Sequence, residues 1–398
     1  MHNRLFLVFV LILLCVCVVR VLTSKAETLP GNKYLKLEAT IIKEPVVGDK
    51  DQIIYIKNLR IYTAMYPKYG VGDRIMVQGM ADDRGRIFKA EVKKVGTRPV
   101  AFAFISSLRQ KILGNIQQIL PEREATLVSG TVLGVDTISA DFKQALTLTG
   151  TIHVVVVSGQ NLMIVAGSIM ALAGYFGRRR CLVISLVCVF FYSILAGFEP
   201  PVIRASLIVL FSTVAIYFGR EVNALWGLFL AGVLMVIVWP LAIFEISFQL
   251  TFAASLGIIT LGQKLSTVFK RLPIVGEGSE VAISAFLFTM PIIVYYFGRV
   301  SILSPIVNML VIEAVLPIML FGFLISILSL IFMPIARLLA ILVYPFTLYF
   351  SQVVTFFAKI DFGQISGGAG NIEFVMIYYL MLFLLILIWR KQVISDKR

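Results

Sequence analysis

Five ionisable side chains stand inside long apolar runs of this sequence, where neighbouring residues offer them few partners. A lone charge at the centre of a membrane helix costs about 2.5–3.5 kcal/mol on insertion scales, so such groups are normally paired or face a wet cavity. Each is therefore a candidate for a functional role. The five residues are His153, Glu199, Arg204, Glu245 and Glu313.

Glu199 and Arg204 flank the Pro-Pro pair at 200–201, which suits the first turn of a helix because the missing N–H would be unpaired there anyway. A carboxylate beside that positive helix end is also favoured. Arg204 then lies a full turn into an apolar helix. Two interpretations stay open: a Glu199–Arg204 pair that only orders the loop, or a guanidinium that faces phosphate groups in a polar path.

Neutral polar residues interrupt the same apolar runs. Hydrocarbon tolerates such groups only where another helix or a water-filled cavity satisfies them. They are explained either by helix–helix packing through small and polar residues or by a polar path through the membrane. The residues are Ser158, Gly159, Gln160, Asn161, Gln249 and Asn308.

Catalytic chemistry finds little support in the sequence. His153 and Ser158 are five residues apart, which separates them around a helix, and Val156 stands where a rhomboid-type G-x-S-G hydrolase motif needs glycine. With two histidines in all, a His-rich metalloprotease or two-metal nuclease centre is excluded. No G-x-x-x-x-G-K-[ST] motif for ATP occurs. We expect a protein that is not an enzyme and holds no metal or cofactor.

The elements that carry these residues are membrane helices. The 398 residues are 59% hydrophobic and 15% charged, with a mean hydropathy of +0.92, whereas soluble domains average roughly 45–50% apolar and about 25% charged residues. The sequence predicts a polytopic α-helical membrane protein with about ten transmembrane helices. The apolar segments are expected at 5–22, 146–176, 181–197, 201–218, 222–239, 241–261, 280–297, 303–330, 337–358 and 372–389.

The distribution of Lys and Arg in short loops predicts how these helices are oriented. With the amino terminus inside the cell, cytoplasmic positions hold thirteen basic residues and the outer flanks hold five. This places the chain in the cell (inner) membrane as a multi-pass protein, with both termini cytoplasmic and residues 23–143 extracytoplasmic. Residues 1–22 form an amino-terminal anchor; Ser24-Lys25-Ala26 also leaves open a cleaved signal peptide.

Residues 33–98 predict a small extracytoplasmic β-barrel that resembles an oligonucleotide-binding (OB) fold. Alternating strands are expected at 34–43, 52–63, 73–80 and 85–95, and the run 70–79 resembles the central turn and strand of that fold. Between residues 23 and 124 there are 18 Lys or Arg against 11 Asp or Glu, interleaved with aromatic residues. This pattern fits sequence-neutral binding of single strands, and equally a solvated barrel with only a structural role.

The predicted DNA-binding residues of this outer domain are Lys57, Arg60, Tyr62, Arg74, Arg86, Lys89 and Lys93. Residues 101–143 predict amphipathic helices on the membrane surface, with apolar residues at helical spacing and Arg109, Lys111 and Gln117 between them. Residues 144–398 form the transmembrane domain.

Several segments, in order along residues 107–322, together resemble the competence domain of the ComEC family. They are Leu-Pro-Glu at 120–122, Leu-Val-Ser-Gly-Thr-Val-Leu-Gly at 127–134, Thr-Gly-Thr-Ile-His at 149–153 with Ser158-Gly159, Arg204-Ala205, Ile-Ser-Phe-Gln-Leu-Thr-Phe at 246–252, Phe-Gly at 297–298 and Ser-Pro-Ile-Val-Asn at 304–308. The outer domain between the first span and the channel also fits the layout of that family.

The resemblance implies a channel that threads single-stranded DNA into the cytoplasm during natural transformation, served by a DNA receptor and a cytoplasmic helicase-like motor. Many relatives carry a carboxy-terminal metallo-β-lactamase-like domain, which this sequence lacks, so degradation of the other strand is expected to fall to a separate nuclease or not to occur. Asn161 stands where relatives often have histidine. Membrane lipids are further partners.

A second hypothesis is a secondary carrier for another anionic or polymeric substrate, because broken helices with carboxylates and amides also build the sites of such transporters. On the leading hypothesis, the polar residues named above line the path of the strand. Arg204 would contact phosphate, the amides would replace water, and the carboxylates would pair with cations or hold helices apart.

Overall fold

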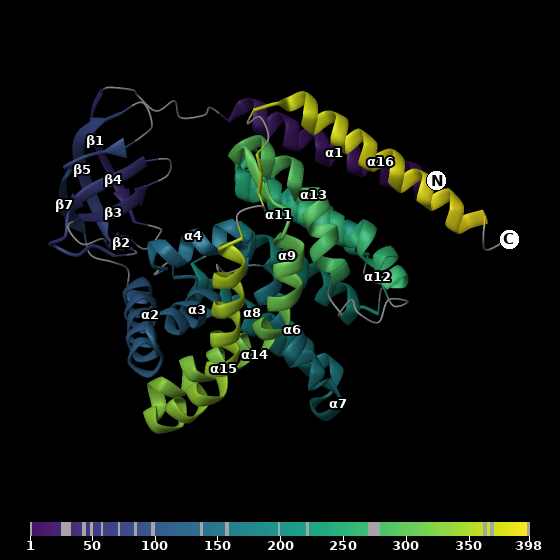
Figure 1. The fold of residues 1–398 in the computed structure, drawn as a ribbon. Helices are drawn as coiled ribbons and strands as arrows, with labels where there is room; N and C mark the ends of the chain where they lie inside the picture. The colour runs from purple at the N-terminus through teal and green to yellow at the C-terminus, as the bar shows by residue number, and fades with distance from the viewer. Residues whose placement is uncertain are drawn as a thin grey trace.

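The computed structural model describes most of the chain, and the account below is confined to those parts. They are residues 2–24, 33–41, 45–47, 51–56, 59–70, 72–82, 86–96, 100–135, 138–155, 159–197, 200–219, 223–269, 279–360, 364–366 and 370–395. A β-sheet domain lies beside a larger helical domain (Figure 1).

Seven short strands of the described chain form the sheet domain, in the order β1-β5-β6-β4-β3-β2, with β7 also pairing with β5. All pairs are antiparallel except β4 with β6. The strands are β1 (Lys33–Thr40), β2 (Val46–Val47), β3 (Asp51–Ile56), β4 (Leu59–Ala64), β5 (Arg74–Ala81), β6 (Arg86–Ile87) and β7 (Glu91–Gly96).

Alternation of side chains explains how this sheet makes a core. In β4 the residues Leu59, Ile61 and Thr63 are buried while Arg60 is exposed, as a period of two requires. The predicted strands 52–63 and 85–95 are each divided in the structure. The first is the β3–β4 hairpin, and the second is interrupted at Lys89, whose φ of 51° takes the backbone out of the extended region.

The turn before β5 is held by a buried carboxylate. Asp73 accepts a hydrogen bond from the backbone N–H of Gly70 at 3.0 Å, and its other oxygen pairs with Lys94 Nζ of β7 at 2.8 Å. Tyr69, also buried, donates its hydroxyl to the Val92 carbonyl at 2.7 Å. The sequence predicts a turn here, and the carboxylate joins that turn to the strand β7.

The helical domain contains the rest of the described elements. They are α1 (His2–Thr23), α2 (Val100–Ile119), α3 (Glu122–Leu133), α4 (Ala140–Leu148), α5 (Ile152–Val155), α6 (Gly159–Ala171), α7 (Ala173–Phe176), α8 (Arg178–Ala196), α9 (Pro200–Tyr217), α10 (Ala224–Val238), η1 (Pro240–Phe244), α11 (Ile246–Gly257), the π-helix η2 (Ile258–Gly262), α12 (Gln263–Phe269), α13 (Ser279–Phe297), β8 (Arg299–Ser301), α14 (Ser304–Ile331), α15 (Met333–Ala358), β9 (Gln364–Ser366) and α16 (Ile372–Ser395).

Four of the described helices are long and apolar enough to cross a membrane, namely α8, α13, α14 and α15. Six shorter apolar helices of 10–17 residues occur within α1, α6, α9, α10, α11 with η2, and α16. The helical character predicted for the chain is thereby confirmed, and the composition of these helices is consistent with a membrane protein. The count of ten spans stays a prediction.

The predicted apolar segment 146–176 is not one helix. Gly150 has a φ of 68°, which ends α4, and the chain then forms the short helix α5 before α6 begins at Gly159. A Cβ at Gly150 would lie 2.4 Å from Ser304 Oγ, so the turn packs tightly on the start of α14. The glycine and the hydroxyls at 149–151 therefore break the run, whose apolar composition alone predicted continuity.

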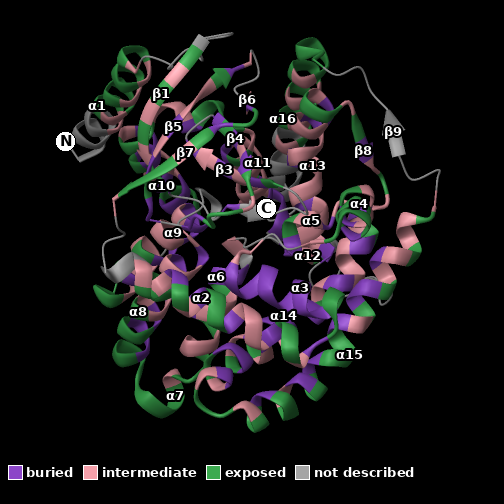
Figure 2. Ribbon diagram, turned by 90° about the vertical axis from the view of Figure 1, so that its left-hand side faces the viewer, coloured by how far each residue is buried: buried purple, intermediate pink, exposed green. Residues whose placement is uncertain are grey.

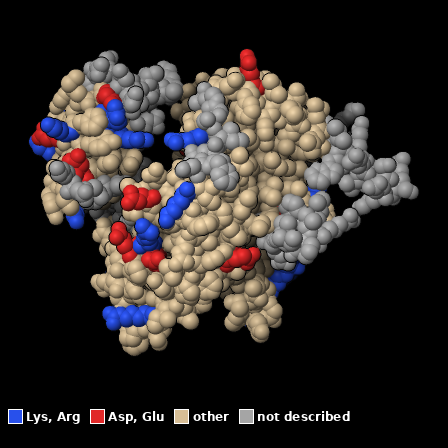
Figure 3. Space-filling model, viewed as in Figure 1, with Lys and Arg blue, Asp and Glu red and all other residues tan. Residues whose placement is uncertain are grey.

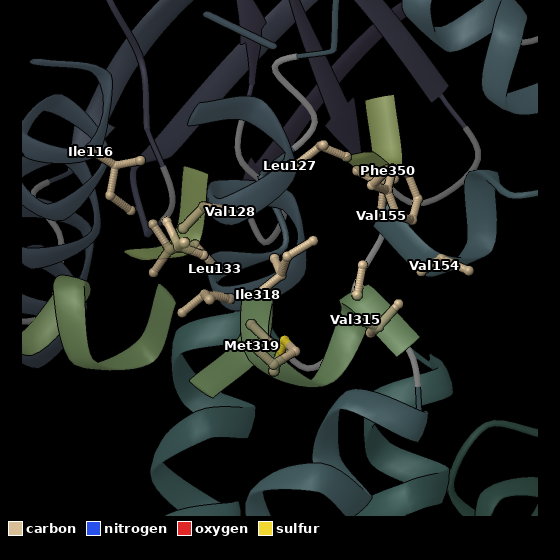
Figure 4. Close-up of a cluster of buried hydrophobic side chains, with 14 of the residues drawn as sticks. Ile116, Leu127, Val128, Leu133, Val154, Val155, Val315, Ile318, Met319 and Phe350 are labelled. Carbon is tan, nitrogen blue, oxygen red and sulfur yellow. The ribbon is translucent and has the colours of Figure 1, made fainter. Parts of the chain in front are cut away.

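The core of the helical domain is built around α3, where every residue from Glu124 to Leu133 is buried. Val128 and Leu133 of α3 face Ile318 and Met319 of α14 (Figure 4), and buried residues gather around these two helices (Figure 2). A helix that lay only on a membrane surface would keep an exposed face. The buried position of α3 is thus a finding that the amphipathic pattern of 101–143 did not indicate.

Two contacts between distant parts of the chain complete the fold. The helix α1 packs on α10, where Arg20 Nε donates to the Ile237 carbonyl at 3.1 Å. The strands β8 and β9 pair antiparallel and so join the α13–α14 connection to the α15–α16 connection. In Figure 1, α1 and α16 lie at the edge of the molecule away from most of the sheet domain.

Candidate nucleic-acid interface

One face of the sheet domain brings together aromatic rings and arginines. The rings of Tyr62 and Phe88 stack with centroids 4.8 Å apart, and the guanidinium of Arg86 lies 5.3 Å from the centroid of Phe88. Arg60 stands directly opposite Arg86 in the parallel β4–β6 pair and is exposed. Phe88 itself is 53% exposed, so one aromatic surface remains open to a ligand. We call Arg60, Tyr62, Arg86 and Phe88 the aromatic face.

Residue alternation produces the aromatic face, because Arg60 and Tyr62 occupy outward positions of β4. Arg86 is held in place by Asp82, which accepts from its Nε at 2.8 Å and from its backbone N–H at 2.7 Å. Lys89 follows Phe88 and is exposed at a positive φ. Lys57, also predicted to bind DNA, lies outside the described residues.

Arg74 and Lys93 lie on a different part of the sheet. Arg74 begins β5, whereas β6 pairs with β5 at its other end, Ala81. Arg74 pairs with Glu38 at 2.8 Å, and Lys93 pairs with Glu91 at 3.0 Å. Exposed pairs of this kind contribute about 0–1 kcal/mol, so each could exchange its carboxylate for another anion. In the view of Figure 3, charged side chains gather over the sheet domain and the neighbouring surface, while the helical surface is mostly uncharged.

Inside the helical domain, side chains from three helices cap the carboxyl end of α3. The last carbonyls of a helix lack intrahelical partners. The Thr131 carbonyl accepts from Asn161 Nδ2 of α6 at 3.0 Å and from the Tyr192 hydroxyl of α8 at 2.8 Å. The Leu133 carbonyl accepts from Arg109 Nη2 of α2 at 3.0 Å. All three donors belong to buried residues.

Two of these capping residues, Arg109 and Tyr192, were not singled out as site residues from the sequence. Arg109 lies among Lys and Gln residues and was assigned to the polar side of its helix; its burial is a correction, explained by the carbonyl that it caps. Tyr192 lies in an apolar run, and nothing in the sequence around it indicates that its hydroxyl caps another helix. Asn161, a predicted path residue, is buried and donates to the protein itself.

Arg204 presents a different environment. Its side chain is buried in α9, and Nη1 has no hydrogen-bond partner among the described residues. The guanidinium lies 5.6 Å from the centroid of Phe252 on α11. Phe252 in turn stacks on Phe248, with centroids 4.2 Å apart. A cation held over an aromatic ring with a donor left unpaired is equipped to receive an anionic group.

Gln249 lies on α11 with Phe252, and Glu245 immediately precedes that helix. Gln249 is three residues before Phe252 and therefore on the same side of α11; its Nε2 donates to the Ile243 carbonyl at 3.1 Å. Glu245 precedes α11, is exposed and makes no capping bond to that helix. Glu199, the proposed partner of Arg204, lies outside the described residues, so the Glu199–Arg204 pair stays a prediction.

The other predicted path residues occupy separate places. Asn308 Nδ2 donates to the Ser304 carbonyl at 2.8 Å, while its Oδ1 is buried without a hydrogen-bond partner in the described chain. Glu313 is exposed and lines an open pocket of about 570 Å³ between α14 and α15, together with Pro345 and Tyr349. His153 is exposed on α5, and Gly159 and Gln160 begin α6. Ser158 lies outside the described residues.

The structure thus brings Arg204 and Gln249 to neighbouring helices but leaves Asn161, Asn308 and Glu313 in distinct surroundings. Among the residues described, no group of three or more His, Cys, Asp or Glu side chains could hold a metal ion. The described arrangement therefore offers cationic, amide and aromatic groups, which suit contact with a phosphodiester chain.

Comparison with known proteins adds an independent finding. The model of a family described as "Competence protein" matches residues 132–392, from the end of α3 into α16. ComE operon protein 3 of Bacillus subtilis (strain 168) is 25% identical over 212 residues, which are 52% of this chain and 27% of that protein.

An uncharacterized protein of Aquifex aeolicus (strain VF5) is 35% identical over 121 residues, which are 30% of this chain and 29% of that protein. The chain thus spans less than a third of the length of each of these relatives. No solved structure matches it.

Proposed function

This chain belongs to the Competence protein family, and on that premise we propose that it is a membrane channel that carries single-stranded DNA into the cytoplasm during natural transformation. The observation that supports this most directly is Arg204, a buried cation in the matched domain whose Nη1 has no hydrogen-bond partner among the described residues. A guanidinium is weakly hydrated and offers a fork of donors that matches phosphate oxygens.

In this proposal Arg204 binds a backbone phosphate as the strand passes α9 and α11. Phe252 holds the guanidinium in place, and the Gln249 amide replaces water on the strand. Asn308 offers as an acceptor further along its Oδ1, which has no hydrogen-bond partner in the described part of the chain. The carboxylates Glu245 and Glu313 bind cations that accompany the strand. No chemistry is performed on the DNA.

The sheet domain receives the strand outside the membrane. We propose that it is an OB-like barrel and that the aromatic face stacks bases while Arg60 and Arg86 follow the phosphates. Base stacking on aromatic side chains contributes about 1–3 kcal/mol per base without sequence preference. A DNA receptor delivers the strand, a cytoplasmic helicase-like motor draws it inward, and a separate nuclease removes its complement where degradation occurs.

The chain would lie in the inner membrane as a multi-pass protein with both termini in the cytoplasm. The apolar helices support this arrangement by length and composition, and the excess of Lys and Arg in the loops assigned to the cytoplasm supports the orientation. Membrane lipids are then its immediate partners.

Entry of labelled single-stranded DNA into liposomes that hold the full chain tests the proposal, with duplex DNA and a neutral polymer as controls. Arg204→Met removes the cation but keeps an apolar side chain of similar length, which buried sites often accept without loss of stability. Arg204→Lys retains the positive charge but lacks the several N–H donors of the planar guanidinium. Arg179→Ala is the matched control, because it removes an arginine over the Tyr217 ring, 5.7 Å from its centroid, at the exposed start of α8.

We expect entry of the single strand in the wild type and a fall of roughly tenfold to a hundredfold in Arg204→Met, since a hydrogen bond to a charged group is worth about 1.5–3 kcal/mol. DNA entry through Arg204→Lys should lie between that of the wild type and that of Arg204→Met. Arg179→Ala should admit DNA as well as the wild type does. No entry in the wild type, even with a membrane potential and an added motor, would refute the channel. Saturable, gradient-driven uptake of a small anion would instead indicate the secondary carrier.

A further inference from the structure

The helix α2 has one buried face and one exposed face, which is polar except for the exposed ring of Phe104 near its start. Ser106, Ile112 and Ile116 are buried, and so is Arg109, which caps α3. Exposed polar side chains follow the other face along its length. They are Ser107, Gln110, Lys111, Gln117 and Gln118. We call these five residues the polar stripe.

The carboxyl end of α2 lies beside one end of the long apolar helices. Asn115 Nδ2 donates to the carbonyl of Ser329, which is two residues before the last residue of α14, at 3.0 Å. Residues 118–121 also line an open pocket of about 410 Å³ with Arg337 and Tyr344 of α15. The end of α2 is therefore level with the connection between α14 and α15.

The amino end of α2 lies near the sheet domain. Val100 follows β7 by four residues, and Figure 1 shows α2 directly below the sheet. The 20 residues of α2 give a length of about 30 Å, which is close to the thickness of the hydrocarbon core of a bilayer. The helix α2 packs on α14, which has the length and composition to cross that core; this favours α2 within the membrane rather than on its surface, where the amphipathic pattern of residues 101–143 predicts it.

A polar stripe at this depth is incompatible with lipid, because amide and ammonium groups in hydrocarbon need polar partners. The stripe also continues from the domain that carries the aromatic face. We propose that the polar stripe of α2 lines the route of the single strand from the sheet domain to the α14–α15 connection. Lys111 contacts phosphate, and the amides of Gln110, Gln117 and Gln118 replace water on the backbone and bases. This inference rests on the proposed function.

Cysteine accessibility in proteoliposomes tests the inference. The four native cysteines, Cys15, Cys17, Cys181 and Cys188, are first replaced by alanine in the full chain, and DNA entry is checked. Ser107→Cys, Gln110→Cys and Gln118→Cys are then treated with a membrane-impermeant maleimide, with and without a single-stranded oligonucleotide. Leu320→Cys is the matched control, because Leu320 is an exposed apolar residue of α14.

We expect all three stripe cysteines to react and Leu320→Cys to resist. The cysteine at 107 should react with reagent on the side of the sheet domain and the one at 118 with reagent on the opposite side. The single strand should slow all three reactions severalfold, and duplex DNA should slow at most the reaction at 107.

Reaction of all three cysteines from the sheet-domain side alone would place α2 on the membrane surface and refute the inference. Absence of reaction would show that lipid or a second copy of the chain covers the stripe, which refutes it too. Reaction without protection by DNA, in liposomes that still admit the single strand, would refute the route while the proposed function stands. Failure of entry in the wild type would instead refute the function.

Discussion

Buried polar side chains of the helical domain fall into two kinds at the scale of single residues. Arg109, Asn161 and Tyr192 donate to carbonyls at the end of α3. Arg204 Nη1, Ser284 Oγ and Asn308 Oδ1 are buried without a hydrogen-bond partner in the described chain. A buried polar group without a partner costs free energy, so the satisfied groups contribute to stability and each unsatisfied one needs an explanation; for Arg204 we propose that it is a bound phosphate.

Tyr192→Phe should lower the free energy of unfolding by about 0.6 kcal/mol, the average for hydrogen bonds between membrane helices, and by at most about 1.7 kcal/mol. The loss is limited because Asn161 still donates to the Thr131 carbonyl. Thermal unfolding of the full chain in detergent measures the change. Tyr175→Phe is the control, because Tyr175 is 87% exposed. An equal effect of both substitutions would contradict the capping role of the Tyr192 hydroxyl.

The pKa of Tyr69 is raised above its ordinary value, first by burial and second by the negative charge of Asp73. The folded sheet domain therefore prefers the neutral phenol. The resulting stability is complete below the unfolded pKa of about 10 and is lost as the pH rises through the higher folded pKa. We expect the stability of wild type to decline in that window more than that of Tyr69→Phe. Unfolding followed between pH 8 and 12 checks this, and parallel curves would contradict it.

At the scale of elements, close crossings between helices depend on particular glycines. A Cβ at Gly257 of α11 would lie 2.4 Å from the Ser284 carbonyl of α13 and 2.8 Å from the Phe288 ring. A backbone carbonyl cannot rotate away as a side chain would. The crossing of α11 and α13 therefore excludes any larger residue at this position.

Gly257→Ala should destabilise the chain by about 1–3 kcal/mol, the usual cost of overpacking. Gly167→Ala on α6 should be neutral or slightly stabilising, because nothing lies within 4 Å of the added Cβ and alanine favours helix. Thermal unfolding of both variants in the same detergent makes the comparison. A tolerated Gly257→Ala would show that α11 and α13 can separate at low cost.

Apolar composition predicted most helices of the chain, and alternation predicted that residues 33–98 hold a sheet. The boundaries that failed depend on single residues. Gly150 breaks the run that begins at 146, and Lys89 breaks the strand expected at 85–95, each through a positive φ. The prediction of one strand over 52–63 is wrong, because the buried positions change from even numbers in β3 (Gln52, Ile54, Ile56) to odd numbers in β4 (Leu59, Ile61, Thr63), and that change of phase marks the hairpin.

At the scale of the whole molecule, charge and apolar surface are segregated. The sheet domain and its neighbourhood carry exposed charges, while the helical domain exposes mostly apolar side chains (Figure 3). The interleaving of basic and aromatic residues predicts a DNA-binding set that includes Arg60, Tyr62 and Arg86 of the aromatic face, and DNA binding by these residues stays a prediction. That pattern could not separate these residues from Arg74 and Lys93, because strand pairing decides which residues share a face.

Nucleic-acid binding by the full chain should depend on the aromatic face. Phe88→Ala should weaken binding of a single strand by about 1–3 kcal/mol if one base stacks there. Arg60→Gln with Arg86→Gln should also flatten the dependence of affinity on salt, since fewer phosphates are neutralised. Fluorescence anisotropy at several salt concentrations measures both. Tyr34→Ala, which removes a ring 66% exposed on β1, is the control; an equal loss there would contradict a specific face.

The docking of α1 on α10 has a consequence for biosynthesis. Arg20 and the Ile237 carbonyl that it contacts are 217 residues apart in the chain. At a translation rate of roughly 5–20 residues per second, the first helix leaves the ribosome roughly 10–40 s before its partner exists. During that interval its contact face is covered by lipid or by the insertion machinery. This face of the bundle can therefore form only after the chain has been made past Ile237.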